Sequence, residues 1–175
     1  IGSHIVELLI KRRIKVIIVD NLSTGFKKLI NNKAKFYKLD IFNKEKLKKI
    51  ILRHNVKSVF HMAASVSVGL GEKFPKKYFK NNVGGTVSLL NACKSMGVKN
   101  FIFSSTAAVY KDGLSKVNEK SKKNPKSVYG KTKLKAENKI VKCCKKYKIN
   151  YGILRYFNVV GASPSGKIGL INKND

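Results

Sequence analysis

Residues 34–63, "AKFYKLDIFNKEKLKKIILRHNVKSVFHMA", follow the order strand, helix, strand. The two outer runs, 34–40 and 57–63, are short, contain Phe, Tyr and Val, and are bounded by turn residues, which predicts buried strands. Between them, residues 42–54 space their apolar side chains three and four apart, a pattern typical of a helix with one apolar face. This order favours parallel strands joined by right-handed crossovers.

The same alternation continues on both sides of this stretch. Strands are predicted at 15–20, 99–105 and 150–157, and helices at 1–13, 78–97 and 129–148. The fold class is therefore α/β, a Rossmann-like doubly wound parallel sheet with helices on both faces. In such sheets ligands bind at the carboxyl ends of the strands. The polar strand ends are Asp20-Asn21, Asp40-Ile41, His61 to Ala64, Ser104 to Thr106 and Tyr156 to Asn158.

The composition indicates one globular domain, because 43% of the 175 residues are hydrophobic. The net charge of +29 would attract polyanions, but the basic residues are spread over nearly every segment. The sequence lacks zinc-finger spacing, a basic-zipper pattern and an aromatic-studded basic motif. We therefore expect weak, salt-sensitive adhesion to polyanions and no specific nucleic-acid partner.

Neither a signal peptide nor a long apolar run is visible in the sequence. These features predict a soluble, cytoplasmic protein without a membrane partner. The three cysteines, Cys93, Cys143 and Cys144, have no metal-ligand spacing, so we expect free thiols in a reduced compartment and no metal site.

Tyr129 and Lys133 are four residues apart in a predicted helix, so their side chains project from one face. An ammonium beside a phenol favours the phenolate, and we expect the pKa of Tyr129 to fall from about 10 toward neutrality. In so lysine-rich a chain, an exposed tyrosine and a solvated lysine would be the ordinary interpretation. The hydroxyls of Ser104, Ser105 and Thr106 favour the catalytic one, because they could share a substrate proton with Tyr129.

The two ends of the sequence lack elements that a dinucleotide-binding fold would have. The chain opens on a helix, and Gly2 would be the last glycine of a glycine-rich turn whose earlier members are not present. Asp20 follows eighteen residues later, close to the separation of about twenty expected for the acid that holds the adenosine ribose. We expect a chain truncated at both ends, lacking its first, central strand and a carboxy-terminal substrate domain.

Seven motifs together resemble the extended short-chain dehydrogenase/reductase family of NAD-dependent epimerases and dehydratases, most closely its UDP-glucose 4-epimerase branch. They run in family order over almost the whole chain. The motifs are "VDNLSTG" (19–25), "LDIFN" (39–43), "FHMAASVSVG" (60–69), "NNVGGT" (81–86), "FIFSSTAAVY" (101–110), "SVYGKTK" (127–133) and "LRYFNVVGASPSGKIG" (154–169).

The resemblance implies NAD as cofactor and a role for each matched residue. Tyr129 would be the base, Lys133 would bind the nicotinamide ribose and hold Tyr129, and Thr106 would orient the sugar 4-hydroxyl. Phe157 and Asn158 would bind substrate. In the cofactor-binding set, Asp20 and Asn21 would contact the adenosine ribose, and Asp40 and Ile41 the adenine. Tyr129, Lys133 and Tyr156 would lie at the nicotinamide. The set also includes Gly2, Met62, Ala63, Ala64, Asn81 and Ser104.

The implied activity is that of an isomerase of galactose metabolism, which interconverts UDP-hexoses through a transient 4-keto sugar as a homodimer. Residues 1–175 would be an incomplete NAD-binding domain, with 159–175 leading into the substrate domain. A dehydratase is disfavoured because its Asp-Glu pair is absent from "TAAVY" (106–110). Two alternatives stay open: an inactive fragment, and another NAD-dependent nucleotide-sugar epimerase or dehydratase. Lys111 and Val66 depart from the family pattern.

Overall fold

The computed structural model describes residues 1–169, which fall into two compact units. Unit 1 comprises residues 1–41 together with the described part of the segment that begins at Asn158. Unit 2 is Phe42–Phe157. Each unit contains its own parallel sheet, so each is described separately.

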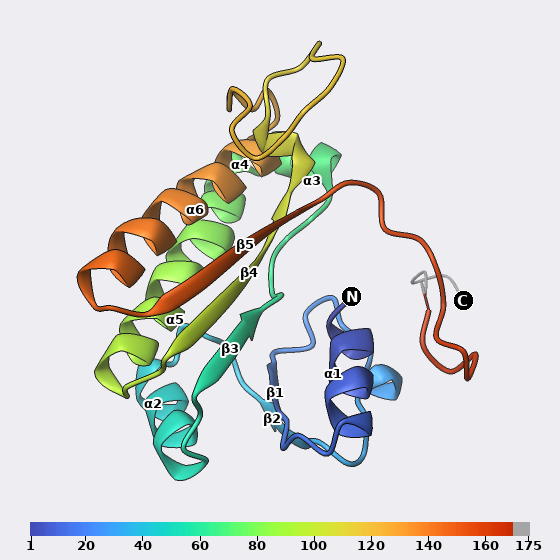
Figure 1. The fold of residues 1–175 in the computed structure, drawn as a ribbon, viewed down its shortest axis with the longest axis vertical. Helices are drawn as coiled ribbons and strands as arrows, with labels where there is room; N and C mark the ends of the chain where they lie inside the picture. Colours follow the sequence, from blue (N-terminus) through green and yellow to red (C-terminus); the bar gives the residue numbers. More distant parts are fainter. Residues whose placement is uncertain (170–175) are drawn as a thin grey trace. The chain divides into compact units, whose positions relative to one another are not determined.

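Unit 1 contains one helix and a two-stranded parallel sheet (Figure 1). Helix α1 spans Gly2–Lys11, strand β1 spans Ile17–Asp20, and strand β2 spans Lys35–Lys38, with a short 3₁₀ turn at Lys27–Leu29 between the strands. The register places Ile17 opposite Lys35 and Asp20 opposite Lys38. The carboxyl ends of both strands therefore lie at one edge, followed by Asn21 and by the Leu39-Asp40 pair.

Unit 2 contains a three-stranded parallel sheet in the order β3, β4, β5. These strands span Ser58–His61, Asn100–Thr106 and Asn150–Tyr156. Helices α2 (Lys44–Arg53), α5 (Gly85–Ser95) and α6 (Val128–Lys146) lie in a row against this sheet, and α6 contacts both β4 and β5 (Figure 1). The register places Thr106 opposite Tyr156, so β4 and β5 end together.

The core of unit 2 lies between its sheet and the three helices. Along β4, Phe101, Phe103 and Ser105 are buried and alternate with less buried residues, as expected for a strand with one face against helices. Removing each Phe side chain from water stabilises the fold by roughly 1.5–3 kcal/mol. The helices contribute the buried side chains of Leu47, Ile50, Ile51, Leu89, Leu90, Cys93, Ala136, Ile140 and Cys144.

Short elements lie between β3 and α5, where the sequence predicted only a helix at 78–97. They are α3 (Val68–Lys73), α4 (Pro75–Tyr78) and a π-helical turn at Phe79–Gly84 that runs into α5. A further 3₁₀ turn, Ala107–Val109, follows β4. Helices of four to six residues are too short to give a repeating apolar pattern, which is why α3 and α4 were not predicted.

The parallel α/β fold class is confirmed, and the five predicted strands are all present. Four of them are shorter than predicted, and β4 is shifted by one residue toward the carboxyl end. The strands form two ladders, β1–β2 and β3–β4–β5. The strand–helix–strand stretch at 34–63 thus runs from one ladder to the other.

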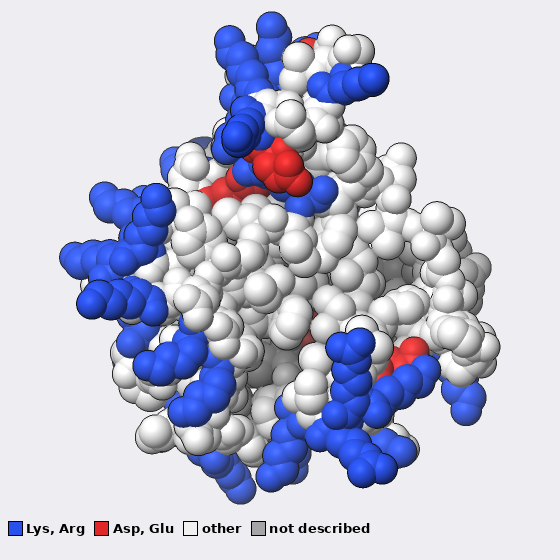
Figure 2. All heavy atoms as spheres, in the orientation of Figure 1, with Lys and Arg blue, Asp and Glu red and all other residues white. Residues whose placement is uncertain are grey.

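The surface of unit 2 is strongly basic. Figure 2 shows Lys and Arg side chains over the loop that follows β4 and over the outer part of α6. The three cysteines are free thiols. Among the described residues, no cluster of His, Cys, Asp or Glu could hold a metal ion. Across residues 1–169, every helix is too short or too polar to cross a bilayer.

Candidate active site

The start of α6 is fixed by two acceptors, and this fixes the position of Tyr129. The side-chain oxygen of Ser127 accepts a hydrogen bond of 3.0 Å from the Gly130 amide, as an N-cap does. Glu72 Oε1 accepts a second hydrogen bond, of 2.7 Å, from the Val128 amide. A carboxylate at a helix amino terminus is favourable both as an acceptor and because of the helix dipole. Glu72, at the end of α3, was not predicted as a site residue.

Gly130 lets α6 approach the loop that follows β4. A Cβ at this position would collide with the main-chain oxygen of Ala108 and would lie 2.9 Å from the Cβ of Pro125. A side chain here would therefore push the helix away from the end of β4. The glycine beside Tyr129 is thus required for the close approach of helix and strand.

Lys133 and Tyr129 lie on the same side of α6, as predicted from their spacing. Lys133 Nζ is 5.9 Å from the centroid of the Tyr129 ring and 4.7 Å from that of Phe103. The ammonium donates a hydrogen bond of 2.6 Å to the main-chain oxygen of Ser104, near the carboxyl end of β4. Lys133 is only 3% exposed. This burial lowers its pKa to about 8, although the negative charge of Glu137 acts in the opposite direction.

The predicted lowering of the Tyr129 pKa is wrong for this structure. Burial of the phenol raises its pKa, because the charged phenolate loses solvation. A hydrogen bond with the Thr106 side chain lowers the pKa by a smaller amount, and nearby Tyr78 raises it. The Lys133 ammonium is bound to the Ser104 carbonyl rather than to the phenol, so its charge does not offset the burial.

Two adjacent asparagines of the π-helical turn connect α6 to the loop after β3. Asn81, a predicted cofactor residue, donates a hydrogen bond of 3.0 Å to Ser65 Oγ. Asn82 is buried; its Oδ1 accepts from the Ser65 amide, and its Nδ2 donates to the Ser65 carbonyl and to Thr132 Oγ1. Thr132 in turn donates to the Tyr129 carbonyl. The sequence analysis missed Asn82, although paired asparagines inside a helical segment, where they are poor helix formers, were an available signal.

The other predicted residues of unit 2 lie at the ends of β3 and β5. Met62, Ala63 and Ala64 follow β3 directly, and Ala63 is exposed. Tyr156 ends β5, and Phe157 beyond it is 68% exposed. Asn158 is exposed and belongs to unit 1. His61, at the end of β3, is buried and hydrogen-bonded to Thr86 Oγ1 at 2.9 Å, and burial lowers its pKa to about 3.

In unit 1, the structure brings Asp20, Asn21 and Asp40 together at the carboxyl ends of β1 and β2. Asp20 Oδ1 accepts a hydrogen bond of 2.7 Å from the Leu22 amide. Asn21 Nδ2 donates to Asp40 Oδ2 at 3.0 Å. Ile41 follows in sequence, and Gly2 is the first residue of α1. The carboxylates at this edge are suited to accept hydrogen bonds from sugar hydroxyls.

Parallel strands, crossover helices and a Tyr-Lys pair at the carboxyl end of a strand define a Rossmann-like α/β protein with a candidate proton-transfer site. The profile of the NAD dependent epimerase/dehydratase family matches residues 1–174. The chain belongs to this family.

Relatives and solved structures agree with this assignment. The chain is 42% identical over 172 residues to the UDP-glucose 4-epimerase of Lactobacillus helveticus, covering 97% of this chain and 52% of that protein. The crystal structure of UDP-glucose 4-epimerase from Brucella ovis in complex with NAD matches with a TM-score of 0.94 at 36% identity, over 99% of this chain and 54% of the other.

A third match is the UDP-glucose 4-epimerase from Thermotoga maritima with UDP-glucose, with a TM-score of 0.86 at 37% identity. That match covers 96% of this chain and 56% of the other. The chain thus spans about half the length of the curated relatives it matches.

Proposed function

We propose that the protein containing this chain catalyses the NAD-dependent 4-epimerisation of a UDP-hexose, interconverting UDP-glucose and UDP-galactose. The observation that carries the proposal is the arrangement of three residues at the end of β4. The Tyr129 phenol lies near enough to the Thr106 side chain for that hydroxyl to lower its pKa, and Lys133 lies one turn along the same face of α6. A phenol, a hydroxyl and a buried ammonium at one strand end are suited to move a proton on and off a sugar hydroxyl.

Each unit, taken by itself, offers side chains that suit a part of NAD. In unit 2, the Lys133 ammonium and the Ser104 carbonyl form a donor and acceptor pair at the end of β4, suited to ribose hydroxyls. In unit 1, Asp20 and Asn21 would hold the adenosine ribose, where a carboxylate would repel the 2′-phosphate of NADP. The bound nicotinamide would accept a hydride from the sugar and return it. Gly2, Asp40, Ile41, Met62, Ala63, Ala64, Asn81 and Tyr156 complete the proposed cofactor set.

The proposed proton path runs through Tyr129. Its phenol oxygen would take the proton of the sugar 4-hydroxyl as C4 is oxidised, and return it after the 4-keto sugar has turned over, while Thr106 orients the hydroxyl. Burial opposes ionisation of Tyr129, and Lys133 is the cation placed to offset that cost once it bonds to ribose and phenol rather than to Ser104. Phe157 and Asn158 would contact the substrate.

Replacing Tyr129 with Phe tests the proposal. In the protein expressed from its natural gene, Tyr129→Phe should lower kcat for conversion of UDP-galactose to UDP-glucose roughly 10³-fold and leave the circular dichroism spectrum unchanged. Tyr151→Phe is the matched control, because Tyr151 lies exposed on β5. Wild-type turnover by Tyr129→Phe would reject the assigned base. Bound NAD without epimerisation in the wild type would favour a silent binding module.

We further propose the domain arrangement and assembly that the family resemblance implies. Residues up to 158 would form the cofactor-binding part, and 159–175 would lead toward a substrate domain; residues 170–175 lie outside the described residues. In residues 158–169 the backbone is held by local bonds, such as that from the Ser163 amide to the Ile168 carbonyl at 2.7 Å. We propose a cytoplasmic homodimer, which sedimentation velocity of the natural protein would test.

A further inference from the structure

Three residues of α6, spaced four apart, meet three consecutive residues of β4. Tyr129 lies close to the Thr106 side chain, Lys133 donates to the main chain of Ser104, and Glu137 accepts a hydrogen bond of 2.5 Å from Ser105 Oγ. The first two contacts belong to the proposed reacting pair. The third extends the same contact line one turn further, with a carboxylate that the proposed reaction does not use.

Glu137 is buried and bound on several sides. Its two carboxylate oxygens accept hydrogen bonds of 2.9 Å from Arg155 Nε and 2.8 Å from Arg155 Nη2. Such forked pairs are the strong, geometrically specific form of an ion pair. Arg155 is the residue of β5 directly opposite Ser105 of β4. Glu137 therefore connects α6 to β4 and to β5 beside the candidate site.

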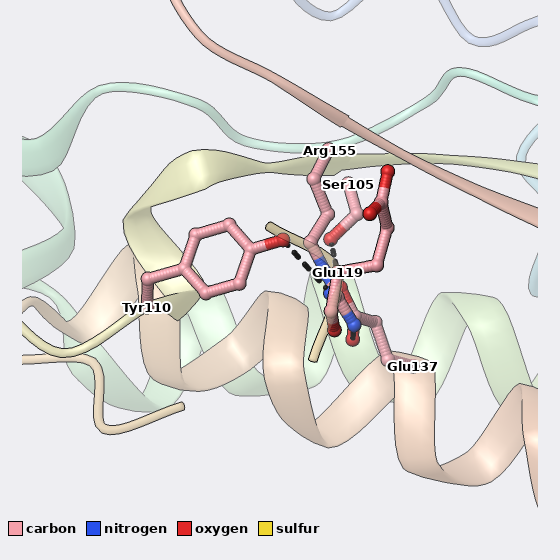
Figure 3. A network of polar contacts seen from close by, with 5 residues as sticks. All are labelled: Ser105, Tyr110, Glu119, Glu137 and Arg155. Atoms are coloured by element: carbon pink, nitrogen blue, oxygen red, sulfur yellow. Dashed lines mark hydrogen bonds and ion pairs between the residues drawn. The ribbon is translucent and has the colours of Figure 1, made fainter. Parts of the chain in front are cut away.

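Arg155 also reaches the loop that follows β4, as Figure 3 shows. Its Nη1 donates 3.0 Å to the Tyr110 hydroxyl and 3.2 Å to the Glu119 carbonyl, and its guanidinium lies 5.2 Å from the centroid of the Tyr110 ring. All donor nitrogens of this guanidinium thus have partners. The ion pair of Lys126 with Asp112, by contrast, lies at the surface, where such pairs contribute little.

We propose that Glu137 is a positioning residue for the Tyr129–Lys133 pair: bound to Arg155 and Ser105, it holds α6 in register with β4 and keeps a negative charge one turn from the Lys133 ammonium. The inference rests on the proposed function, because it names what places the reacting pair. Burial lowers the pKa of Lys133, and the Glu137 carboxylate acts in the opposite direction. The titratable groups that lie near Lys133 are His61 on β3 and Tyr129 and Glu137 on α6. Two more lie one step further away: Arg155 on β5, which is paired with Glu137, and Tyr78 on α4, which acts on Tyr129.

The decisive test is the titration of Lys133 itself, measured by NMR of its Cε–Hε group in the full chain and assigned by the peak missing from Lys133→Arg. Glu137→Gln keeps the size of the side chain but removes its charge, and it leaves Arg155 uncompensated. The titration midpoint of Lys133 should shift downward. Amide exchange of residues 128–137 should become faster, because the helix loses part of its attachment to β4 and β5.

Glu45→Gln is the matched control, because Glu45 on α2 is exposed and paired with Lys48 at the surface. It should leave the Lys133 midpoint unchanged. If Glu137→Gln does not fold, the double variant Glu137→Gln/Arg155→Gln removes both charges at once. The Lys133 midpoint of this double variant should still lie below that of the wild type. A folded Glu137→Gln protein with the wild-type Lys133 midpoint would overturn the inference. Failure of the epimerase proposal would instead appear as turnover by Tyr129→Phe, which this titration does not measure.

Discussion

The ammonium of Lys133 is held 2.6 Å from the main-chain oxygen of Ser104, two residues before Thr106 on β4. This bond satisfies a buried cation with a neutral acceptor. A neutral acceptor only partly replaces the water that the ammonium loses, and so the lysine is costly to the fold. Its proposed role at the active site and its effect on stability therefore oppose each other.

Lys133 should make stability rise with pH in the alkaline range. Its pKa is about 8 in the folded chain against 10.5 as the ordinary value, so between these values the unfolded chain binds more protons and the free energy of unfolding increases with pH. The full difference corresponds to roughly 3 kcal/mol. Lys133→Met should be stabilised relative to wild type most at pH 7, and less by pH 10, in urea unfolding. For Lys131→Met, on the exposed side of α6, the difference in stability from the wild type should be the same at pH 7 and pH 10.

His61 should make the chain sensitive to acid. Its pKa of about 3 in the folded state lies below the ordinary 6.5, so stability is fully present above pH 6.5 and is lost as pH falls toward 3. The loss over this range is about 5 kcal/mol. His61→Gln, which can still bond to Thr86, should flatten the dependence in urea unfolding at pH 7.5 and 4. An unchanged slope in this variant, with His54→Gln as control, would contradict the assignment.

Gly130→Ala should destabilise the protein by about 3 kcal/mol, because the added methyl group overpacks the contact between α6 and the loop after β4. Thermal unfolding measures this cost. Gly69→Ala is the control: it adds the same group to α3, where nothing lies within 4 Å, and should be neutral or stabilising by about 0.5–1 kcal/mol. Equal effects of the two changes would show that the approach at Gly130 is not tight.

Asn82→Ala should cost about 3 kcal/mol, since it removes four hydrogen bonds and leaves the Ser65 amide without its acceptor. The loss should also appear as faster amide exchange at Ser65. Asn138→Ala, on the exposed side of α6, removes an amide that makes no comparable contacts and should change stability by less than about 0.5 kcal/mol. Comparable urea midpoints for the two variants would reject the role of Asn82.

The sequence predicted those parts of the molecule whose residues interact with their near neighbours. The apolar run 99–105 could only be a buried strand, and the four-residue spacing of Tyr129 and Lys133 placed both on one helical face. The direction of the Tyr129 pKa was mispredicted because spacing reports proximity and not burial. Whether the ammonium bonds to a phenol or to the Ser104 carbonyl depends on how closely α6 approaches β4.

The contacts that were missed join residues distant in sequence. Glu137 and Arg155 are each unremarkable as single letters in so charged a chain, and only the packing of α6 on β4 and β5 pairs them. Asn82 joins segments 17 and 50 residues away. Short elements such as α4 depend on the fixed φ of Pro75 and on the π-helical turn, neither of which has a periodic signal.

The pairing of Glu137 with Arg155 has a consequence for the order in which the chain can fold during synthesis. The ribosome completes α6 before it adds the strand that carries the arginine, so a carboxylate docked early would be buried without its counter-ion. Stable docking of α6 must therefore wait until β5 has emerged from the exit tunnel. A nascent chain halted before residue 155 should leave this helix accessible to protease, and one extended well past it should protect it.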